Sequence, residues 1–418
     1  MITTACSGDS AAQGEDDGQP LEVWSRSGPE AAQSYEALFD KFTEETGIEV
    51  EYLATVEFET QLQSRAAAKD LPDVMIYDQS SMAGYADQGF VLPVDPEEIE
   101  GAEELSSESW DSVTVADGTV YGVPFSRHTQ MTFVNKEWRE ELGFDQPTDH
   151  DELIELAAAF ATEDPDGNGV EGDTYGMAVP GTTDRGFFTW WIASYLWQRG
   201  GDFVEGSDGE YSAAINNEES VEALEWVQQL FCEPNMVQPN ALSNASATPF
   251  FAEGQAGIYQ TGPYAFSDFD NNLGKDTYEV LPAPSGPSSS TTLTERTSIY
   301  FGASTNKPDK QEALAEFLIT EEAQELGMDS PGQPVVRLPV HESVSAAEVY
   351  DDERWDLVEE QFQDSELLPY DIDFTVSRQD IAESLNSLYG DCNADVQQQM
   401  DDLADIINED LRSRDALK

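Results

Sequence analysis

Apolar and polar positions follow two different periods along the first 80 residues of the chain. Residues 21–24 and 48–52 alternate as strands do, and residues 74–77 form a continuous apolar run typical of a buried strand. Between them, residues 30–46 and 62–68 carry apolar side chains at helical spacing. The order strand, helix, strand, helix, strand predicts an α/β fold with a parallel sheet.

The rest of the chain predicts further strands and helices. Residues 120–125 and 131–134 are expected strands, and Ser126, Arg127 and His128 between them are expected to pass from one lobe to another. Helices are expected at residues 151–161, 221–231, 310–319 and 396–411, and a loop or lobe crossing at residues 283–294.

Length and charge narrow the class of protein. The chain has 418 residues, 39% of them hydrophobic, which is enough for two or three domains with buried cores. It carries 85 acidic residues against 19 basic ones, of which seven are Lys, and its formal net charge is −66. Such a charge argues against nucleic acids and anionic membranes as partners. Because the Debye length falls to about 3 Å in molar salt, we expect a halophilic protein with an acidic surface that folds better at high salt. An acidic secreted protein in ordinary medium is the alternative.

The N-terminal segment and the cysteines bear on export. Cys6 follows Ala5 and precedes small, polar and acidic residues, which resembles the mature start of a bacterial or archaeal lipoprotein. Residues 1–20 are thus expected to be a flexible lipoprotein-like tether with Cys6 as the lipid anchor; a stray Cys in a disordered tail is the alternative. If the protein is exported, a Cys232–Cys392 disulfide is plausible, with two buried thiols as the other interpretation. No run of about 18 apolar residues exists, so no membrane span is expected.

Several short motifs follow one another along nearly the whole chain. They are Leu38-Phe39-Asp40-Lys41-Phe42 with Gly47-Ile48-Glu49-Val50, Leu71-Pro72-Asp73-Val74, Gly84-Tyr85-Ala86-Asp87-Gln88-Gly89, Tyr121-Gly122-Val123-Pro124, Asn135-Lys136, Ala252-Glu253-Gly254-Gln255-Ala256-Gly257, Gly262-Pro263-Tyr264, Leu281-Pro282-Ala283-Pro284 and Ser304-Thr305-Asn306-Lys307. In this order they resemble the extracellular solute-binding proteins of sugar ABC importers, specifically the maltose-binding protein group. The chain departs from that family at Tyr264, where Trp is frequent.

The resemblance implies an α/β, two-lobed fold like that of periplasmic binding proteins, with crossing strands as the hinge. By order along the chain, residues 20–125 and 296–328 would form the N-terminal lobe, and residues 126–295 and 329–418 the C-terminal lobe. Both lobes would close on a sugar held between them. The implied partners are a carbohydrate ligand and the transmembrane subunits of an ABC permease. The protein would be a monomer anchored by lipid to the outer face of the cytoplasmic membrane.

Sugar binding requires flat rings for the C–H faces of the sugar and planar polar groups for its hydroxyls. The densest aromatic cluster contains Trp190 and Trp191, either of which is a candidate to stack on a pyranose, although their spacing from neighbouring rings also suits a buried helix face. His128 is more often a core or surface histidine than a ligand contact. The other candidates lie at strand ends, at the crossing and around the Gly-Pro turn. They are Ser25, Arg26, Ser27, Tyr77, Asp78, Gln79, Arg127, Tyr259, Tyr264, Arg296 and Tyr300.

An acidic loop suggests a structural calcium ion. The candidate ligands are Asp164, Asp166, Asn168, Val170 and Asp173, at spacings similar to those of an EF-hand loop. Tyr175 stands where an EF-hand has its closing Glu, so Asp173 would have to complete the shell. An acidic turn without an ion is the alternative, and no cofactor is required.

The favoured function is a receptor, not an enzyme, that closes on a sugar and delivers it to an ABC permease. A secreted, salt-tolerant glycoside hydrolase is the alternative, but with 85 acidic residues a suitable carboxylate pair is expected by chance. No GxSxG, HExxH or phosphate-loop motif is present. A third hypothesis keeps the fold and replaces the sugar with another solute.

Overall fold

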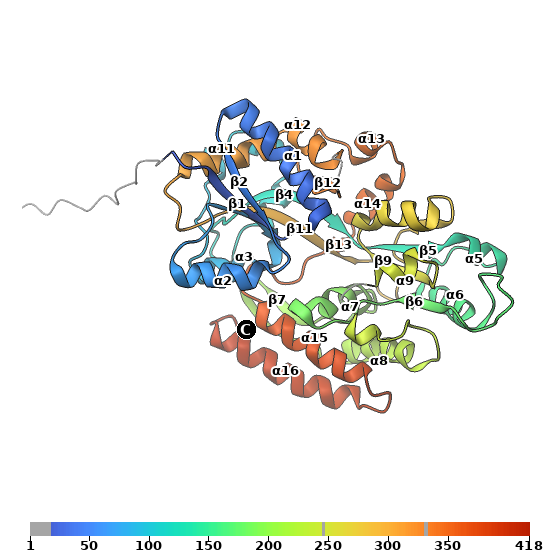
Figure 1. Ribbon diagram of the computed structural model, residues 1–418. Coiled ribbons are helices and arrows are strands. Elements are labelled where there is room, and N and C mark those ends of the chain that lie inside the picture. The colour runs from blue at the N-terminus through green and yellow to red at the C-terminus, as the bar shows by residue number, and fades with distance from the viewer. Residues whose placement is uncertain (1–17, 245–246, 330–332) are drawn as a thin grey trace, which may run out of the picture.

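The apolar segments near the N-terminus form the parallel part, at one edge, of a seven-stranded sheet in the computed structural model, which describes residues 18–244, 247–329 and 333–418 (Figure 1). The strand order is β12-β4-β11-β3-β1-β2, with β13 paired to β11. β11 runs antiparallel to both β3 and β4. The strands are β1 (Leu21–Ser25), β2 (Val50–Ala54), β3 (Val74–Asp78), β4 (Val123–Thr129), β11 (Thr292–Phe301), β12 (Leu338–Pro339) and β13 (Ser365–Glu366).

A second, four-stranded sheet has the order β10-β5-β9-β6, and β7 and β8 form a separate hairpin. Figure 1 places β5, β6 and β9 at the far end of the molecule from β1 and β2. These strands are β5 (Met131–Asn135), β6 (Tyr175–Ala178), β7 (Val204–Ser207), β8 (Glu210–Ala213), β9 (Ala256–Thr261) and β10 (Tyr278–Leu281).

Helices surround both sheets, and their buried side chains follow the helical spacing of the sequence. In the first of them the buried residues include Tyr35, Leu38, Phe39 and Phe42, and Gly47 ends the helix in the left-handed conformation. The helices are α1 (Pro29–Thr46), α2 (Phe58–Ala68), α3 (Met82–Asp87), α4 (Ser107–Asp111), α5 (Lys136–Glu141), α6 (His150–Thr162), α7 (Phe187–Gln198), α8 (Glu218–Cys232), α9 (Thr248–Ala252), α10 (Phe266–Phe269), α11 (Pro308–Leu318), α12 (Glu321–Met328), α13 (Ala346–Tyr350), α14 (Arg354–Phe362), α15 (Thr375–Tyr389) and α16 (Val396–Ser413).

Two paired strands connect the sheets. β4 leads through Gln130 directly into β5 of the second sheet, and β11 lies beside β4 and packs against α7. The prediction that Ser126, Arg127 and His128 separate two strands is wrong, because all three lie within β4. Their polar side chains suggest a loop, but their backbone pairs with β11, where Arg127 lies opposite Arg296 and His128 opposite Glu295.

The same pairing places the strands differently from the predicted lobe boundaries. β4 continues to Thr129 and β11 begins at Thr292, so both extend past the predicted limits at residues 125 and 296. β12 joins β4 of the first sheet, although residues 329–418 were expected in the C-terminal lobe. Backbone hydrogen bonds between strands cross these limits because the ladder continues wherever a neighbouring strand is present.

One hydrophobic cluster contains core residues of both sheets, among them Val23 of β1 and Phe133 of β5. A second large cluster packs α6, α7, α8, α15 and α16 around the second sheet, and Figure 1 shows α15 and α16 side by side. In α16 the buried positions include Val396, Met400, Leu403, Ile407 and Leu411, as the sequence predicts. Within the described ranges, no helix has both the length and the hydropathy to cross a bilayer. The predicted tether, as far as residue 17, and its Cys6 lie outside the described residues.

Candidate functional site

A cavity of about 330 Å³ lies between the ends of β1 and β3 on one side and α7, β9 and the segment after β9 on the other. This volume is at the lower end of the roughly 300–1,000 Å³ typical of small-molecule sites. The structure brings nine of the predicted ligand-binding residues together in its wall: Arg26, Ser27, Tyr77, Asp78, His128, Trp190, Tyr259, Tyr264 and Arg296.

The N-terminus of α1 contributes to the wall on the side of the seven-stranded sheet. After β1 the chain turns at Ser27 and Gly28 into the helix, with Pro29 at its first position. Gly28 provides no side-chain cap. Because Ser27, Gly28 and Ala31 all line the cavity, the partial positive charge of this helix end lies at the cavity wall.

The facing wall depends on a left-handed turn before α7. Arg185 and Gly186 have φ values of 58° and 70°. A Cβ atom at Gly186 would lie 2.9 Å from the carbonyl oxygen of Arg378, so this position requires glycine. The turn starts α7 so that Phe187 and Trp190, whose rings meet edge to face at 5.5 Å, both line the cavity.

Arg185 connects the two sides of the cavity. Its Nε donates to Oε1 of Glu59 at 2.5 Å, and its Nη2 donates to Oδ2 of Asp78 at 2.8 Å and to the hydroxyl of Tyr77 at 2.9 Å. The Tyr77 hydroxyl also donates to Glu59. Burial opposes the charge of Arg185, but the carboxylates of Asp78 and Glu59 outweigh it and raise its pKa. Arg185 is therefore a charged link between α2 and β3 on one side and the start of α7 on the other.

A second buried arginine supports the Trp190 ring. The guanidinium carbon of Arg378, in α15, lies 4.3 Å from the centroid of the Trp190 ring, within cation–π range. Its Nη1 donates to the hydroxyl of Ser80 at 2.9 Å. Burial and repulsion from Arg185 lower the pKa of Arg378 to about 10, so the side chain keeps its charge at neutral pH.

Close packing at a glycine positions the Tyr264 ring. A Cβ atom at Gly262 would lie 2.4 Å from the Tyr264 ring and 2.8 Å from the His128 ring, so only glycine fits there. His128 Nε2 lies 3.1 Å from a carboxylate oxygen of Glu295. Burial raises the pKa of Tyr264, so its hydroxyl stays protonated and can donate or accept a hydrogen bond.

The other five predicted residues lie outside the cavity wall. Ser25 and Gln79 are 1% exposed; Ser25 bonds to the hydroxyls of Ser27 and Tyr52, and Gln79 donates to the carbonyl of Ser112. Strand and helix geometry account for the remaining three, because neighbours on one element face different sides. Arg127 binds Pro339 and Glu359, whereas Trp191 and Tyr300 lie in the hydrophobic core.

The family of the chain follows from comparison with known proteins. A family profile described as "Bacterial extracellular solute-binding protein" matches residues 27–325. The chain belongs to this family. FusA, the fructooligosaccharide ABC transporter substrate-binding protein of Streptococcus pneumoniae, is 24% identical to it over 273 residues, which cover 60% of this chain. The aligned part of this solute-binding protein covers 50% of the length of FusA.

Solved structures share the fold of this solute-binding protein. A solute-binding protein of an ABC transporter from Thermotoga lettingae, bound with α-D-tagatose, matches with a TM-score of 0.81 and 19% identity, over 94% of this chain and all of the other. Maltose-bound MalE3 of T. maritima matches with a TM-score of 0.80 and 20% identity, over 93% of this chain and 98% of that one. The predicted two-lobed α/β fold is therefore confirmed.

The cavity of this solute-binding protein also contains residues that were not among the predicted ones. Arg185, Phe187, Glu295, Gln333 and Arg337 all line it. Phe187 belongs to the aromatic cluster that the sequence indicates, and the scarcity of cations in the chain is a signal that points to both arginines. No local sequence signal identifies Gln333, because it reaches the wall through contacts with α1.

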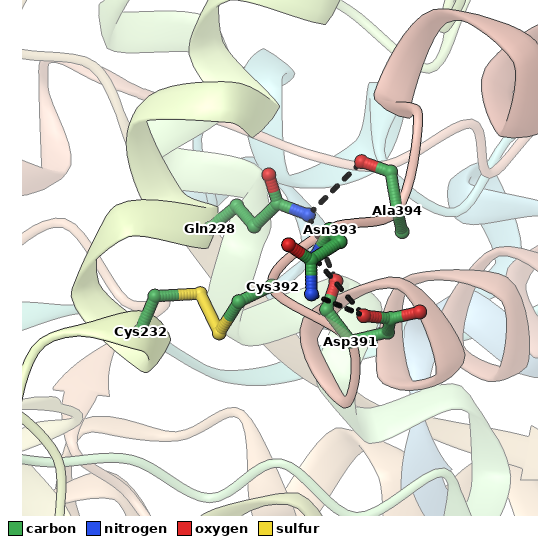
Figure 2. The surroundings of a disulfide bond; sticks show 6 residues. All are labelled: Gln228, Cys232, Asp391, Cys392, Asn393 and Ala394. Atoms are coloured by element: carbon green, nitrogen blue, oxygen red, sulfur yellow. Dashed lines mark hydrogen bonds between the residues drawn. A yellow bond between two sulfur atoms is a disulfide. The ribbon is translucent and has the colours of Figure 1, made fainter.

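The two cysteines on α8 and after α15 form a disulfide (Figure 2). Cys232 and Cys392 are 160 positions apart in the sequence, and their Cα atoms are 5.7 Å apart. Gln228, one turn earlier on α8, donates to the carbonyls of Asp391 and Ala394 and holds the same loop. The bond joins two segments of the second lobe, and neither cysteine lines the cavity.

The acidic loop before β6 is held together by its own hydrogen bonds. The Asn168 amide donates to Asp166 at 2.8 Å and to Asp173 at 2.9 Å, and Asp164 accepts from the backbone of Gly169. Across the described part of the chain, no group of three or more His, Cys, Asp or Glu side chains is placed to hold a metal ion. Calcium binding by Asp164, Asp166, Asn168, Val170 and Asp173 stays a prediction.

Proposed function

We propose that this solute-binding protein is the receptor of a sugar ABC importer, which binds a sugar or oligosaccharide between its lobes and delivers it to the permease. The observation that carries the proposal is the composition of the cavity wall. The rings of Phe187, Trp190 and Tyr264 lie among guanidinium, carboxylate and amide groups that both lobes contribute.

This combination suits the chemistry of a sugar. Phe187 and Tyr264 are only partly buried, so each has ring surface available for the C–H face of a pyranose. Arg26, Arg337 and Gln333 provide directed donors for hydroxyl groups, and hydrogen bonds of charged groups contribute about 1.5–3 kcal/mol each. The relatives support the same class of ligand, since their names refer to fructooligosaccharide, tagatose and maltose.

Closure of the lobes around the ligand would occur about the paired strands β4 and β11. These strands connect the sheets, and Arg185 bridges the cavity from the second lobe to Glu59 and Asp78 of the first. A sugar that touches both walls would favour the closed arrangement because it binds that arrangement more tightly. The ligand then leaves unchanged, which makes the protein a receptor and not an enzyme.

The proposed partners follow from this function. The closed, loaded receptor would dock on the transmembrane subunits of an ABC permease as a monomer. Lipid on Cys6, joined to the lobes by the tether of residues 1–20, would keep it at the outer face of the cytoplasmic membrane. Intact-mass analysis of the protein from native membranes tests the anchor: the mass of a diacylglyceryl group on Cys6 supports it, and a free thiol contradicts it.

A glycoside hydrolase is disfavoured by the carboxylates that line the cavity. Asp78 forms an ion pair with Arg185, and Glu295 lies against His128. A hydrolase needs one protonated carboxyl group as a general acid and a second as a nucleophile or base, on opposite sides of the scissile bond. Neither side chain is free of a cationic or imidazole partner here, so the pair suits binding better than bond cleavage.

A thermal-shift screen in multimolar KCl, with mono- and oligosaccharides of different composition, tests the proposal. We expect at least one saccharide to raise the melting temperature with increasing concentration, because a ligand of the native state stabilises it by mass action. Chromatography of the recovered sugar should show it intact. Released products would overturn the receptor function, and no shift with any saccharide would favour a non-sugar solute.

Matched variants locate the binding. We expect Phe187→Ala to weaken binding of the active saccharide about tenfold, the loss of roughly one ring contact. Phe231→Ala is the control, because Phe231 is also a half-buried ring of the second lobe but packs on Tyr389, away from the cavity. Equal effects of the two substitutions would show that ring loss acts through stability and would contradict the assigned site.

A further inference from the structure

The cavity concentrates positive charge in a chain that is otherwise strongly acidic. The chain has 85 acidic residues and only twelve Arg, yet four of these arginines line this one cavity, beside only two carboxylates. The arginines are Arg26, Arg185, Arg296 and Arg337, and the carboxylates are Asp78 and Glu295. Arg185 and Arg296 also pair with Glu59 and Glu108 outside the wall, so the excess of positive charge comes from Arg26 and Arg337. A cleft for a neutral ligand needs no such excess, since neutral hydroxyls are bound equally well by amides and hydroxyls.

Within the described ranges, Arg337 has no anionic partner. Among the described residues, its side chain forms no ion pair, and its Nε is buried without a hydrogen-bond acceptor. Its backbone N–H donates to the Ser126 hydroxyl at 3.1 Å, and its guanidinium carbon lies 5.8 Å from the centroid of the Tyr264 ring. A half-buried cation without a carboxylate is costly, because its lost hydration is not replaced.

Arg337 and the uncapped N-terminus of α1 line the same cavity. The backbone N–H of Gln333 donates to the carbonyl of Glu30 at 3.1 Å, and the Ser34 hydroxyl donates to the carbonyl of Gln333 at 2.8 Å. These bonds hold the segment before Arg337 against the first two turns of the helix. The guanidinium and the helix N-terminus therefore both attract an anion to this cavity.

Two further buried arginines near the cavity also keep unpaired donors. The side chain of Arg296 is 9% exposed and pairs with Glu108, but its Nε has no acceptor. Arg378 is 5% exposed, has Ser80 as its only side-chain hydrogen-bond acceptor among the described residues, and its Nε is likewise without an acceptor. Of these two arginines, Arg296 lines the cavity. Buried polar atoms are rarely left without a partner, so its Nε favours a ligand rich in hydrogen-bond acceptors.

We propose that the ligand is an acidic saccharide of one or two rings, a uronic acid or a disaccharide that contains one, whose carboxylate pairs with Arg337 at the N-terminus of α1. This proposal rests on the sugar-receptor function and specifies its ligand. The planar guanidinium matches a carboxylate with two parallel hydrogen bonds. The cavity volume of about 330 Å³ suits a ligand of this size.

Calorimetric titrations of the full chain at one fixed, high KCl concentration test the proposal with matched ligands. The probes are galacturonic and glucuronic acid, the digalacturonate, their methyl esters and the neutral parents galactose and glucose. The esters keep the shape of the acids and remove the charge. We expect at least one free acid to bind at least tenfold more tightly than its own ester and its neutral parent.

Substitutions that keep an unbranched side chain at position 337 test whether Arg337 contacts the carboxylate. We expect Arg337→Met to abolish the preference for the acid over its ester, and Arg337→Lys to restore part of it. Arg412→Met is the control, because Arg412 is exposed near the end of α16, away from the cavity, and should leave the preference unchanged. Should Arg337→Met not fold, the comparison of acid and ester on the unaltered protein still decides.

The outcomes separate this proposal from the receptor function. Neutral sugars that bind as tightly as the acids would overturn the acidic ligand and leave the receptor function intact. The same holds if Arg337→Met weakens the binding of acid and ester by the same factor. Absence of binding to every acid, ester and neutral sugar would overturn both.

Discussion

The bridge across the cavity gives the prediction with the most direct structural basis. Replacing Arg185 with Met removes the guanidinium that contacts Glu59, Asp78 and the Tyr77 hydroxyl, and retains an unbranched side chain of similar reach. These partners belong to the first lobe, whereas Arg185 precedes α7 in the second. The substitution should therefore favour separation of the lobes over the arrangement seen in the structure.

The exposure of the three charged side chains determines how much free energy the two ion pairs contribute. Arg185 is 24% exposed, and its partners Glu59 and Asp78 are 36% and 35% exposed. Exposed pairs contribute about 0–1 kcal/mol, and breaking a fully buried pair costs about 3–5 kcal/mol. Two pairs of intermediate exposure should contribute about 2 kcal/mol together, which corresponds to roughly a 30-fold change in the ratio of closed to open molecules.

Small-angle X-ray scattering of the unliganded protein measures the ratio of closed to open molecules. Because no ligand is present, a direct contact between Arg185 and a ligand does not affect this measurement. We expect a larger radius of gyration for Arg185→Met than for the unaltered protein, and saccharide affinity that falls by up to about 30-fold because the binding-competent form is less populated. Arg199→Met is the control, since Arg199 lies at the C-terminal end of α7 and packs on Trp226. An unchanged radius together with unchanged affinity would refute the role of the bridge.

Three further predictions concern stability. Replacing Cys232 and Cys392 with Ser opens a loop of 160 positions and should lower the free energy of unfolding by about 4–5 kcal/mol in denaturant titrations; a loss below about 1 kcal/mol would contradict this. The melting temperature should rise steadily from dilute to multimolar KCl, because screening relieves the repulsion behind a net charge of −66, and a flat curve would argue against a halophilic protein. If residues 164–173 bind calcium, a chelator should lower the melting temperature and Asp164→Asn should abolish that effect; equal melting with chelator and with calcium would exclude a stabilising ion.

The parallel strands of the first sheet and nine of the 21 residues that line the cavity could be predicted from the sequence, several of them from local signals. The alternation and helical spacing of residues 21–77 indicate β1, α1, β2, α2 and β3, and the ends of parallel strands provide Arg26, Ser27, Tyr77 and Asp78. The same signals could not show which of two adjacent residues faces the cavity. Trp190 lines the cavity and Trp191 the core because successive helix residues point about 100° apart.

The residues that the sequence did not identify depend on contacts between distant segments. Arg185 is placed by a left-handed turn, and its partners Glu59 and Asp78 lie more than 100 positions earlier. Arg337 precedes the two-residue strand β12, whose pairing with β4 no periodicity reveals. Such pairings arise from the tertiary fold, which local patterns in a single sequence do not encode.

A crystal structure of the protein with the saccharide that gives the largest thermal shift tests the central claim most directly. We predict one intact saccharide in the cavity between the lobes, in contact with Phe187 or Tyr264 and with polar groups of both walls. A saccharide bound only on an outer surface, or density for cleaved products, would contradict the assignment of this cavity to sugar binding.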